Sequence, residues 1–152
     1  MADGGKSPNR IYDVEQMLVY GVFLQLALDI EAATRSFAPD FRWLRVQCLR
    51  SSESVCANMT EGFYSQYSTE YMQSLYRCRR EARETITHIR YALGVKQLSE
   101  IDGTTLISKY EEALLQLTSL IGSIERKIAH RGKAKDTSIQ IREEEEEYSA
   151  KL

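Results

Sequence analysis

Two side chains in the stretch SESVCANMTEGFYS, residues 52–65, come nearest to a reaction centre. On a helix Asn58 and Glu61 lie one turn apart, so the carboxylate could act as an acid or base and the amide as an oxyanion donor. Both roles need a third group and a substrate pocket, and the sequence supplies neither. The alternative is structural: Asn58 and Glu61 satisfy free backbone groups where a helix ends, and a left-handed Gly62 closes that helix. We interpret the stretch in this second way and predict no catalytic residue.

Basic side chains form the second constellation that could do chemistry. At helical spacing Arg79, Arg83 and Arg90 fall on one line, which is typical of a surface that follows a phosphate backbone. Tyr76 and Tyr91 could add faces on which bases stack. The residues that we predict for this surface are Arg42, Arg45, Arg50, Arg79, Arg83, Arg90, Arg126, Lys127, Arg131, Lys133 and Lys135.

Two further arginines are expected to contribute little to this surface. Arg77 and Arg80 each precede a glutamate by four residues, so we expect Glu81 and Glu84 to neutralise them. An alternative for the whole line is that it pairs with acidic groups of a neighbouring subunit. Binding of nucleic acid would in any case be directed at the backbone and non-specific, because no residue pattern reads base edges.

Metal and thiol chemistry find little support in the sequence. Di-iron bundles use a Glu and a His three residues apart, whereas Glu84 and His88 are four apart and no second pair exists. Cys48, Cys56 and Cys78 contain no CxxC spacing, and we interpret them as buried thiols in a reducing compartment. We therefore expect no metal, no cofactor and no enzymatic activity.

The elements that position these residues are helices. With 152 residues, 43% of them hydrophobic, and only 8 Gly and 2 Pro, the chain is typical of one all-α domain. The first predicted helix spans residues 11–37 and buries Leu18, Val22, Leu26, Ile30, Ala33 and Phe37.

Three more helices follow in the sequence. The second starts after an N-cap at Asp40 and ends at Gly62; its stripe is Phe41, Leu44, Cys48, Ser52, Val55 and Met59. The third is capped by Ser68, has Glu70 in its first turn, and ends at Gly94; it buries Tyr71, Leu75, Cys78, Ala82, Ile86, Ile89 and Leu93. The fourth follows a link at 96–103 and stops near Gly132; it buries Leu106, Tyr110, Ala113, Leu117, Leu120 and Ile124.

Short links between four long helices predict an antiparallel up-down-up-down bundle. The first helix is apolar in nearly every direction between Met17 and Leu28, and the fourth carries a second seam, Ile107, Leu114, Ile121 and Ile128. Three neighbours cover only part of a helix, so these faces predict contact with another subunit. The alternative is that the connections and the N-terminal arm fold over them.

The chain ends are expected to lie outside the bundle. We predict a flexible arm at 1–10, the bundle at 11–132, and a charged extension at 133–152 that carries Glu143 to Glu147. The net charge is −2, but residues 1–135 hold 18 basic and 16 acidic residues. The start has no apolar run of a secretory signal, and the longest apolar block, 17–28, is too short to cross a bilayer. We therefore expect a cytoplasmic protein with no membrane contact.

The segment at residues 45–92 resembles the bacterial four-helix-bundle family of proteins encoded by intervening sequences of 23S rRNA genes. Gln47-Cys48-Leu49-Arg50, leading to Ser54-Val55-Cys56-Ala57-Asn58-Met59-Thr60-Glu61-Gly62, is similar to a basic QLRRA-like stretch followed by a SIxANIAEG-like signature. The signature is followed in the family by an EFxxFLxxAxGSLxE-like stretch, which Glu70-Tyr71, Ser74-Leu75 and Glu84 resemble. Cys78, Arg80 and Glu81 depart from it, because small residues are usual there.

The resemblance implies a protomer of four helices that assembles into a ring-shaped homopentamer, and it implies no enzymatic activity. A distant relative is the accessory variability determinant of diversity-generating retroelements, a basic barrel that partners a reverse transcriptase and nucleic acid. The partners implied are therefore other copies of this chain, RNA or DNA, or a nucleic-acid-processing protein.

Overall fold

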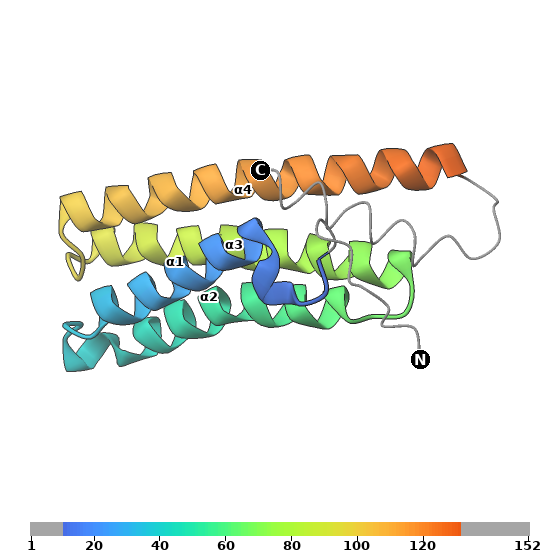
Figure 1. Cartoon of the computed structure of the whole chain (residues 1–152). Helices are drawn as coiled ribbons and strands as arrows, with labels where there is room; N and C mark the ends of the chain where they lie inside the picture. Colours follow the sequence, from blue (N-terminus) through green and yellow to red (C-terminus); the bar gives the residue numbers. More distant parts are fainter. Residues whose placement is uncertain (1–10, 132–152) are drawn as a thin grey trace.

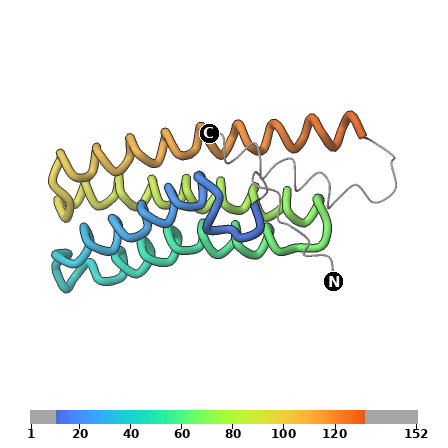
Figure 2. The backbone as a smooth tube through the Cα atoms, in the orientation of Figure 1, coloured from blue at the N-terminus to red at the C-terminus, as the bar shows by residue number. Residues whose placement is uncertain are grey.

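The structure is a computed structural model in which residues 11–131 are described. Four helices make up most of it: α1 Leu18–Thr34, α2 Arg42–Phe63, α3 Ser68–Gly94 and α4 Glu100–Arg131. Two short 3-10 turns, η1 Val14–Gln16 and η2 Pro39–Phe41, precede α1 and α2. Consecutive helices run in opposite directions (Figures 1 and 2). The predicted all-α antiparallel four-helix bundle is confirmed, and no strand occurs within residues 11–131.

The helices pack in a closed order around one core. α1 contacts α2 and α4, and α3 contacts the same two helices from the other side. The predicted stripes of α2, α3 and α4 are buried, except that Phe41 and Leu93 are half-buried. The second seam of α4 is also used inside the protomer, because Leu114 and Ile121 are buried and the two outer residues of the seam pack against the core. The prediction that this seam meets another subunit is therefore wrong.

The inward face of α1 differs from the prediction at three positions, because Leu18 is exposed and Val22 and Ala33 are only half-buried. The buried positions are Val19, Phe23, Leu26, Ile30 and Thr34, whereas Leu18 is 47% exposed. In a helix that is apolar in every direction, periodicity does not distinguish one face from the next. The phase of α1 is set instead by which face meets α2 and α4.

The start of α1 is also later than predicted. The helix begins at Leu18, and residues 11–17 form η1 and its flanks instead of two helical turns. The side chains of Ile11, Val14 and Met17 are nevertheless buried in the core. The Val14 amide donates a hydrogen bond to Tyr64 Oη at the end of α2 (3.2 Å). This segment packs against the end of α2 and against α3, where the Tyr71 hydroxyl donates a hydrogen bond to Met17 Sδ (3.7 Å).

Two predicted N-caps are occupied by other residues. Asp40 lies within η2, and the N-cap of α2 is Phe41. Ser68 is the first residue of α3, and Tyr67 is its N-cap, although Glu70 stands in the first turn as predicted. The chain enters α2 through a 3-10 turn with Pro39 at its first position, so the true start of the α-helix lies beyond Asp40.

The link between α3 and α4 is shorter than predicted. α3 ends at Gly94, as expected, but Lys96 is the left-handed residue (φ 62°). Its amide donates to Leu93 O (3.1 Å), and the Gln97 amide donates to Ala92 O (2.8 Å), which satisfies free carbonyls at the helix end. α4 then begins at Glu100 and includes Gly103, which was predicted to lie in the link.

Candidate nucleic-acid interface

The signature residues do not end a helix. Asn58 donates from Nδ2 to the backbone oxygen of Ser54 (2.8 Å) and to its Oγ (3.1 Å), one turn back inside α2. Glu61 is exposed, and its carboxylate makes no hydrogen bond or ion pair with any described residue. Because α2 continues to Phe63, the prediction that Asn58 and Glu61 satisfy the helix end is wrong.

Gly62 serves close packing of two helices. It is helical, and a Cβ built on it would lie 2.4 Å from Ser74 Cβ and 3.1 Å from a ring carbon of Tyr71. The predicted left-handed closure is therefore wrong: Gly62 is required because α3 passes too near for any side chain. The signature marks the crossing of α2 over α3.

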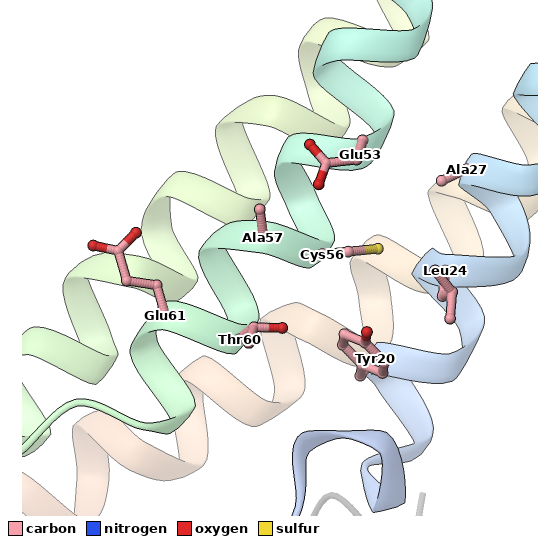
Figure 3. Close-up of a pocket in the computed structure, with 8 residues that line it drawn as sticks. All are labelled: Tyr20, Leu24, Ala27, Glu53, Cys56, Ala57, Thr60 and Glu61. Atoms are coloured by element: carbon pink, nitrogen blue, oxygen red, sulfur yellow. The ribbon is translucent and has the colours of Figure 1, made fainter.

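A groove of about 420 Å³ lies between α1 and α2 beside the signature. Figure 3 shows Cys56 and Thr60 pointing from α2 toward α1, and Tyr20 pointing back. Burial raises the pKa of the Cys56 thiol to about 11, so this sulfur is protonated at neutral pH and is a poor nucleophile. No cluster of residues suited to hold a metal ion occurs within residues 11–131.

Arg50 joins α2 to α3 and determines the charge of the α3 surface. Its guanidinium contacts Glu81 Oε2 (3.4 Å) and, more closely, Glu84 Oε1. It was predicted to face a phosphate backbone, but in the structure it neutralises two glutamates of the neighbouring helix. The predicted pairs of these glutamates with Arg77 and Arg80 do not form.

Three arginines of α3 are therefore left without an acidic partner in the described chain. Arg77, Arg80 and Arg83 are exposed and make no ion pair with residues 11–131. They follow one another at three-residue steps, which places them along one side of the helix. We call Arg77, Arg80, Arg83 and Arg90 the arginine ridge. The prediction that Arg77 and Arg80 are neutralised is wrong, because an arginine from another helix occupies Glu81 and Glu84.

The other predicted arginines of α3 are more constrained. Arg79 is half-buried, with its guanidinium carbon 5.3 Å from the centre of the Tyr76 ring. Tyr76 Oη donates to Glu125 Oε1 of α4 (2.5 Å), and this hydrogen bond raises the pKa of Tyr76. Arg90 lies 3.8 Å from Glu111, and both side chains are exposed. Tyr76 is thus engaged between α3 and α4, and Arg79 lies against its ring.

The remaining predicted basic residues lie at the ends of α2 and α4. Arg42 is exposed, while Arg45 is half-buried and contacts Glu31 at 3.3 Å. On α4, Arg126 is exposed, and Lys127 and Arg131 are half-buried. Lys133 and Lys135 lie outside the described residues. The arginine ridge therefore lies on α3 alone, whereas these two groups belong to α2 and α4.

An aromatic pair adjoins the ridge and was not predicted. Trp43 of α2 and Tyr91 of α3 lie edge to face, with ring centres 5.4 Å apart and planes at 70°. Both side chains remain about half exposed. Only Tyr91 was singled out in the sequence, because the partnership with Trp43 depends on the register between α2 and α3.

A comparison with known protein families shows to which family the chain belongs. The model of the family described as 23S rRNA-intervening sequence protein matches residues 15–119. The chain belongs to this family. No curated protein matches it. The resemblance noted in the sequence is thereby confirmed.

The family match covers most of the surface described above. Residues 15–119 of this intervening-sequence protein include α1, α2, α3 and the greater part of α4, and therefore the arginine ridge and the aromatic pair. The basic end of α4 lies beyond the matched range. No helix within residues 11–131 is both long and apolar enough to span a membrane.

Proposed function

We propose that this protein is a non-enzymatic subunit of a homo-oligomeric assembly that binds the backbone of RNA or DNA through the arginine ridge. The observation that carries the proposal is the pairing of Arg50 with Glu81 and Glu84. Glu81 and Glu84 are the only glutamates within residues 77–90, the segment that carries the ridge. Because Arg50 neutralises both, Arg77, Arg80 and Arg83 remain exposed without an acidic partner among residues 11–131. Such a row is suited to phosphates, which guanidinium groups bind strongly.

The salt dependence of binding tests this proposal. Single-stranded RNA and duplex DNA are titrated at about 0.05 M and 0.2 M salt, where contacts to several phosphates lose affinity steeply because fewer counterions are released. Binding at low salt that falls by at least tenfold is expected. Failure of both nucleic acids to bind at low salt would leave a purely structural or protein-binding oligomer as the function.

Matched variants locate the contact. The double variant Arg80→Gln and Arg83→Gln should weaken binding and reduce the slope of log affinity against log salt by about 1.5 to 2, roughly one per lost phosphate contact. The control is Arg35→Gln with Lys109→Gln, which removes the same charge from the C-cap of α1 and from α4. If the two double variants lose the same affinity, then overall charge and not the ridge determines binding.

The exposed face of α1 supports the oligomeric part of the proposal. Leu24 and Leu28 are 40% and 56% exposed, and Leu24 also lines the groove against α2 (Figure 3). Large side chains on one face beside an apolar groove are typical of subunit contacts. A closed ring of five subunits, as the family resemblance implies, would cover this face and repeat the ridge five times.

The mass of the protein in solution tests the assembly. A pentamer would have five times the 17.5 kDa of the monomer in sedimentation or light scattering. Leu24→Glu should dissociate it, whereas Ile101→Glu, at a 78% exposed position on α4, should leave the mass unchanged. A wild-type monomer would contradict the proposal.

Five ridges on one ring could also receive a nucleic-acid-processing protein that carries its own RNA or DNA. A reverse transcriptase is the partner that the distant resemblance to the retroelement accessory protein implies. The ridge would bind such a partner through the phosphates of the RNA or DNA that the partner carries. Capture of the partner should therefore depend on bound nucleic acid and disappear after nuclease treatment.

A further inference from the structure

The aromatic pair of Trp43 and Tyr91 lies at the surface, where α2 meets α3. Trp43 is 51% exposed and Tyr91 is 49% exposed. Their edge-to-face geometry lets the edge of one ring cover one face of the other, so the remaining ring faces are not used by the pair. Such faces are available to a flat, apolar group from outside the protomer.

The pair continues the arginine ridge along α3. Positions 80, 83, 87 and 91 succeed one another at helical steps of three and four residues, and all four side chains are exposed. Tyr91 lies eight residues beyond Arg83, about 12 Å along the helix axis. A chain that follows the arginines toward the C-terminal end of α3 therefore arrives at the two rings.

The charges near the pair favour a nucleic acid over a protein. Arg90 is adjacent to Tyr91 in the sequence, and Arg42 is adjacent to Trp43; both are exposed. The last two turns of α3 contain no glutamate; Glu84, just before them, is held by Arg50, and Glu111 of α4 lies 3.8 Å from Arg90. Basic groups next to open aromatic faces match the charged backbone and the flat bases of a single strand.

We propose that Trp43 and Tyr91 stack against bases of single-stranded RNA or DNA whose backbone lies along the arginine ridge. A duplex cannot be bound in this way, because its bases are stacked on one another. This inference rests on the proposed function and adds a contact to the bases. Because every base has a flat face, the contact confers a preference for single strands and not for a sequence.

The fluorescence of Trp43 measures this contact directly, since it is the only tryptophan in the chain. At low salt the full-length protein is titrated with a single-stranded RNA of 12 nucleotides, with a strand of the same length that lacks bases, and with the 12-base-pair duplex. Stacking should quench the emission with the base-bearing strand only. The strand without bases should bind about 5- to 100-fold more weakly and leave the emission unchanged.

Variants of Tyr91 separate stacking from a structural role. Tyr91→Ala should lower the affinity for the base-bearing strand at least about fivefold and leave the affinity for the strand without bases unchanged. Tyr91→Phe should retain wild-type affinity because it keeps the ring. Tyr67→Ala, at a 50% exposed position before α3, is the matched control and should change neither affinity. Circular dichroism checks that each variant is folded.

The outcomes distinguish this inference from the proposed function. Equal affinity for both single strands without quenching would overturn the stacking contact and leave the ridge intact as a backbone site. Absence of binding by all three probes would overturn the proposed function itself. If acrylamide cannot quench Trp43 in the free oligomer, then the pair is covered by another copy of the chain, and the inference is also wrong.

Discussion

At Gly62 and Ser74 the helices α2 and α3 approach each other too closely for a side chain at position 62. Gly62→Ala would place a Cβ 2.4 Å from Ser74 Cβ, and both atoms belong to helices that cannot easily move apart. Overpacking of this kind costs about 1–3 kcal/mol, against a gain of about 1 kcal/mol from the better helix propensity of alanine. We expect the free energy of unfolding to fall by up to about 2 kcal/mol in urea titrations followed by circular dichroism.

The control for this substitution is Gly21→Ala in α1. No atom lies within 4 Å of a Cβ built on Gly21, so only the helix propensity changes and stability should rise by about 0.5–1 kcal/mol. Adding Ser74→Gly to Gly62→Ala should recover part of the lost stability, because it removes the clashing Cβ. If Gly62→Ala is as stable as Gly21→Ala, then the two helices are not in tight contact at this point.

The hydroxyl of Tyr110 is a second residue with an energetic consequence. It is buried and has no hydrogen-bond partner among residues 11–131, and burial raises the pKa of Tyr110. A buried donor without a partner costs about 1–3 kcal/mol. Tyr110→Phe should therefore leave the free energy of unfolding unchanged or increase it by about 1 kcal/mol. Tyr71→Phe, which loses the hydrogen bond to Met17 Sδ (3.7 Å), should not be stabilising.

At this scale the sequence predicts residue types better than residue partners. The arginines of α3 were predicted to be a basic line, but Glu81 and Glu84 were assigned to Arg77 and Arg80 four residues away. In the structure they meet Arg50, which is about 30 residues away in sequence and on another helix. Spacing along one helix cannot reveal a partner that the packing of two helices supplies.

Arg50 links two elements, and its removal should affect binding more than folding. Its side chain is 47% exposed, and ion pairs at such positions contribute at most about 1 kcal/mol. Arg50→Ala should therefore change the thermal midpoint little. It frees Glu81 and Glu84 beside the ridge, so affinity for single-stranded RNA at low salt should fall severalfold.

The control for Arg50→Ala is Arg35→Ala, which also breaks an exposed arginine–glutamate pair, with Glu31 in the last turn of α1 (2.6 Å). Arg35 is the C-cap of α1, so its removal should leave the affinity unchanged. A loss of affinity at Arg50 that persists when Glu81 and Glu84 are both replaced by Gln would show that Arg50 contacts the nucleic acid itself, as the sequence predicted.

The helices were predictable to different degrees for a physical reason. α2, α3 and α4 each combine an apolar stripe with polar remaining faces, so their buried residues could be read from periodicity. α1 lacks polar faces, and its predicted stripe began at Leu18, which is exposed, instead of Val19. The 3-10 turn before it was also missed, because Val14 and Met17 continue an apolar pattern although the backbone there is not α-helical.

The core contains three buried thiols, which make the folded protein less stable as the pH rises. Burial raises the pKa of Cys48 and of Cys56 from 9.0 to about 11, and it raises the pKa of Cys78 further. The folded protein thus retains protons that the unfolded chain loses above pH 9. Each such group lowers the free energy of unfolding by about 1.4 kcal/mol per pH unit between pH 9 and its folded pKa.

Urea titrations at pH 8, 9 and 10 under reducing conditions measure this loss. Stability should be nearly constant up to about pH 8.5 and then decline as the pH rises toward 11. Cys56→Ser removes one titrating group, so its decline should be shallower, whatever its stability at pH 8. A free energy of unfolding that does not change between pH 8 and pH 10 would contradict the burial of these thiols.

The two ends of the bundle differ in how they are closed. At one end α1 and the other three helices form a complete bundle, whereas at the other end residues 11–17 stand in for a fourth helix (Figure 1). This segment has a single 3-10 turn and few backbone hydrogen bonds of its own, so local opening there costs less than unfolding of the whole protein. In amide hydrogen exchange it should lose protection first, exposing the parts of α2 and α3 that it covers while the four-helix end remains closed.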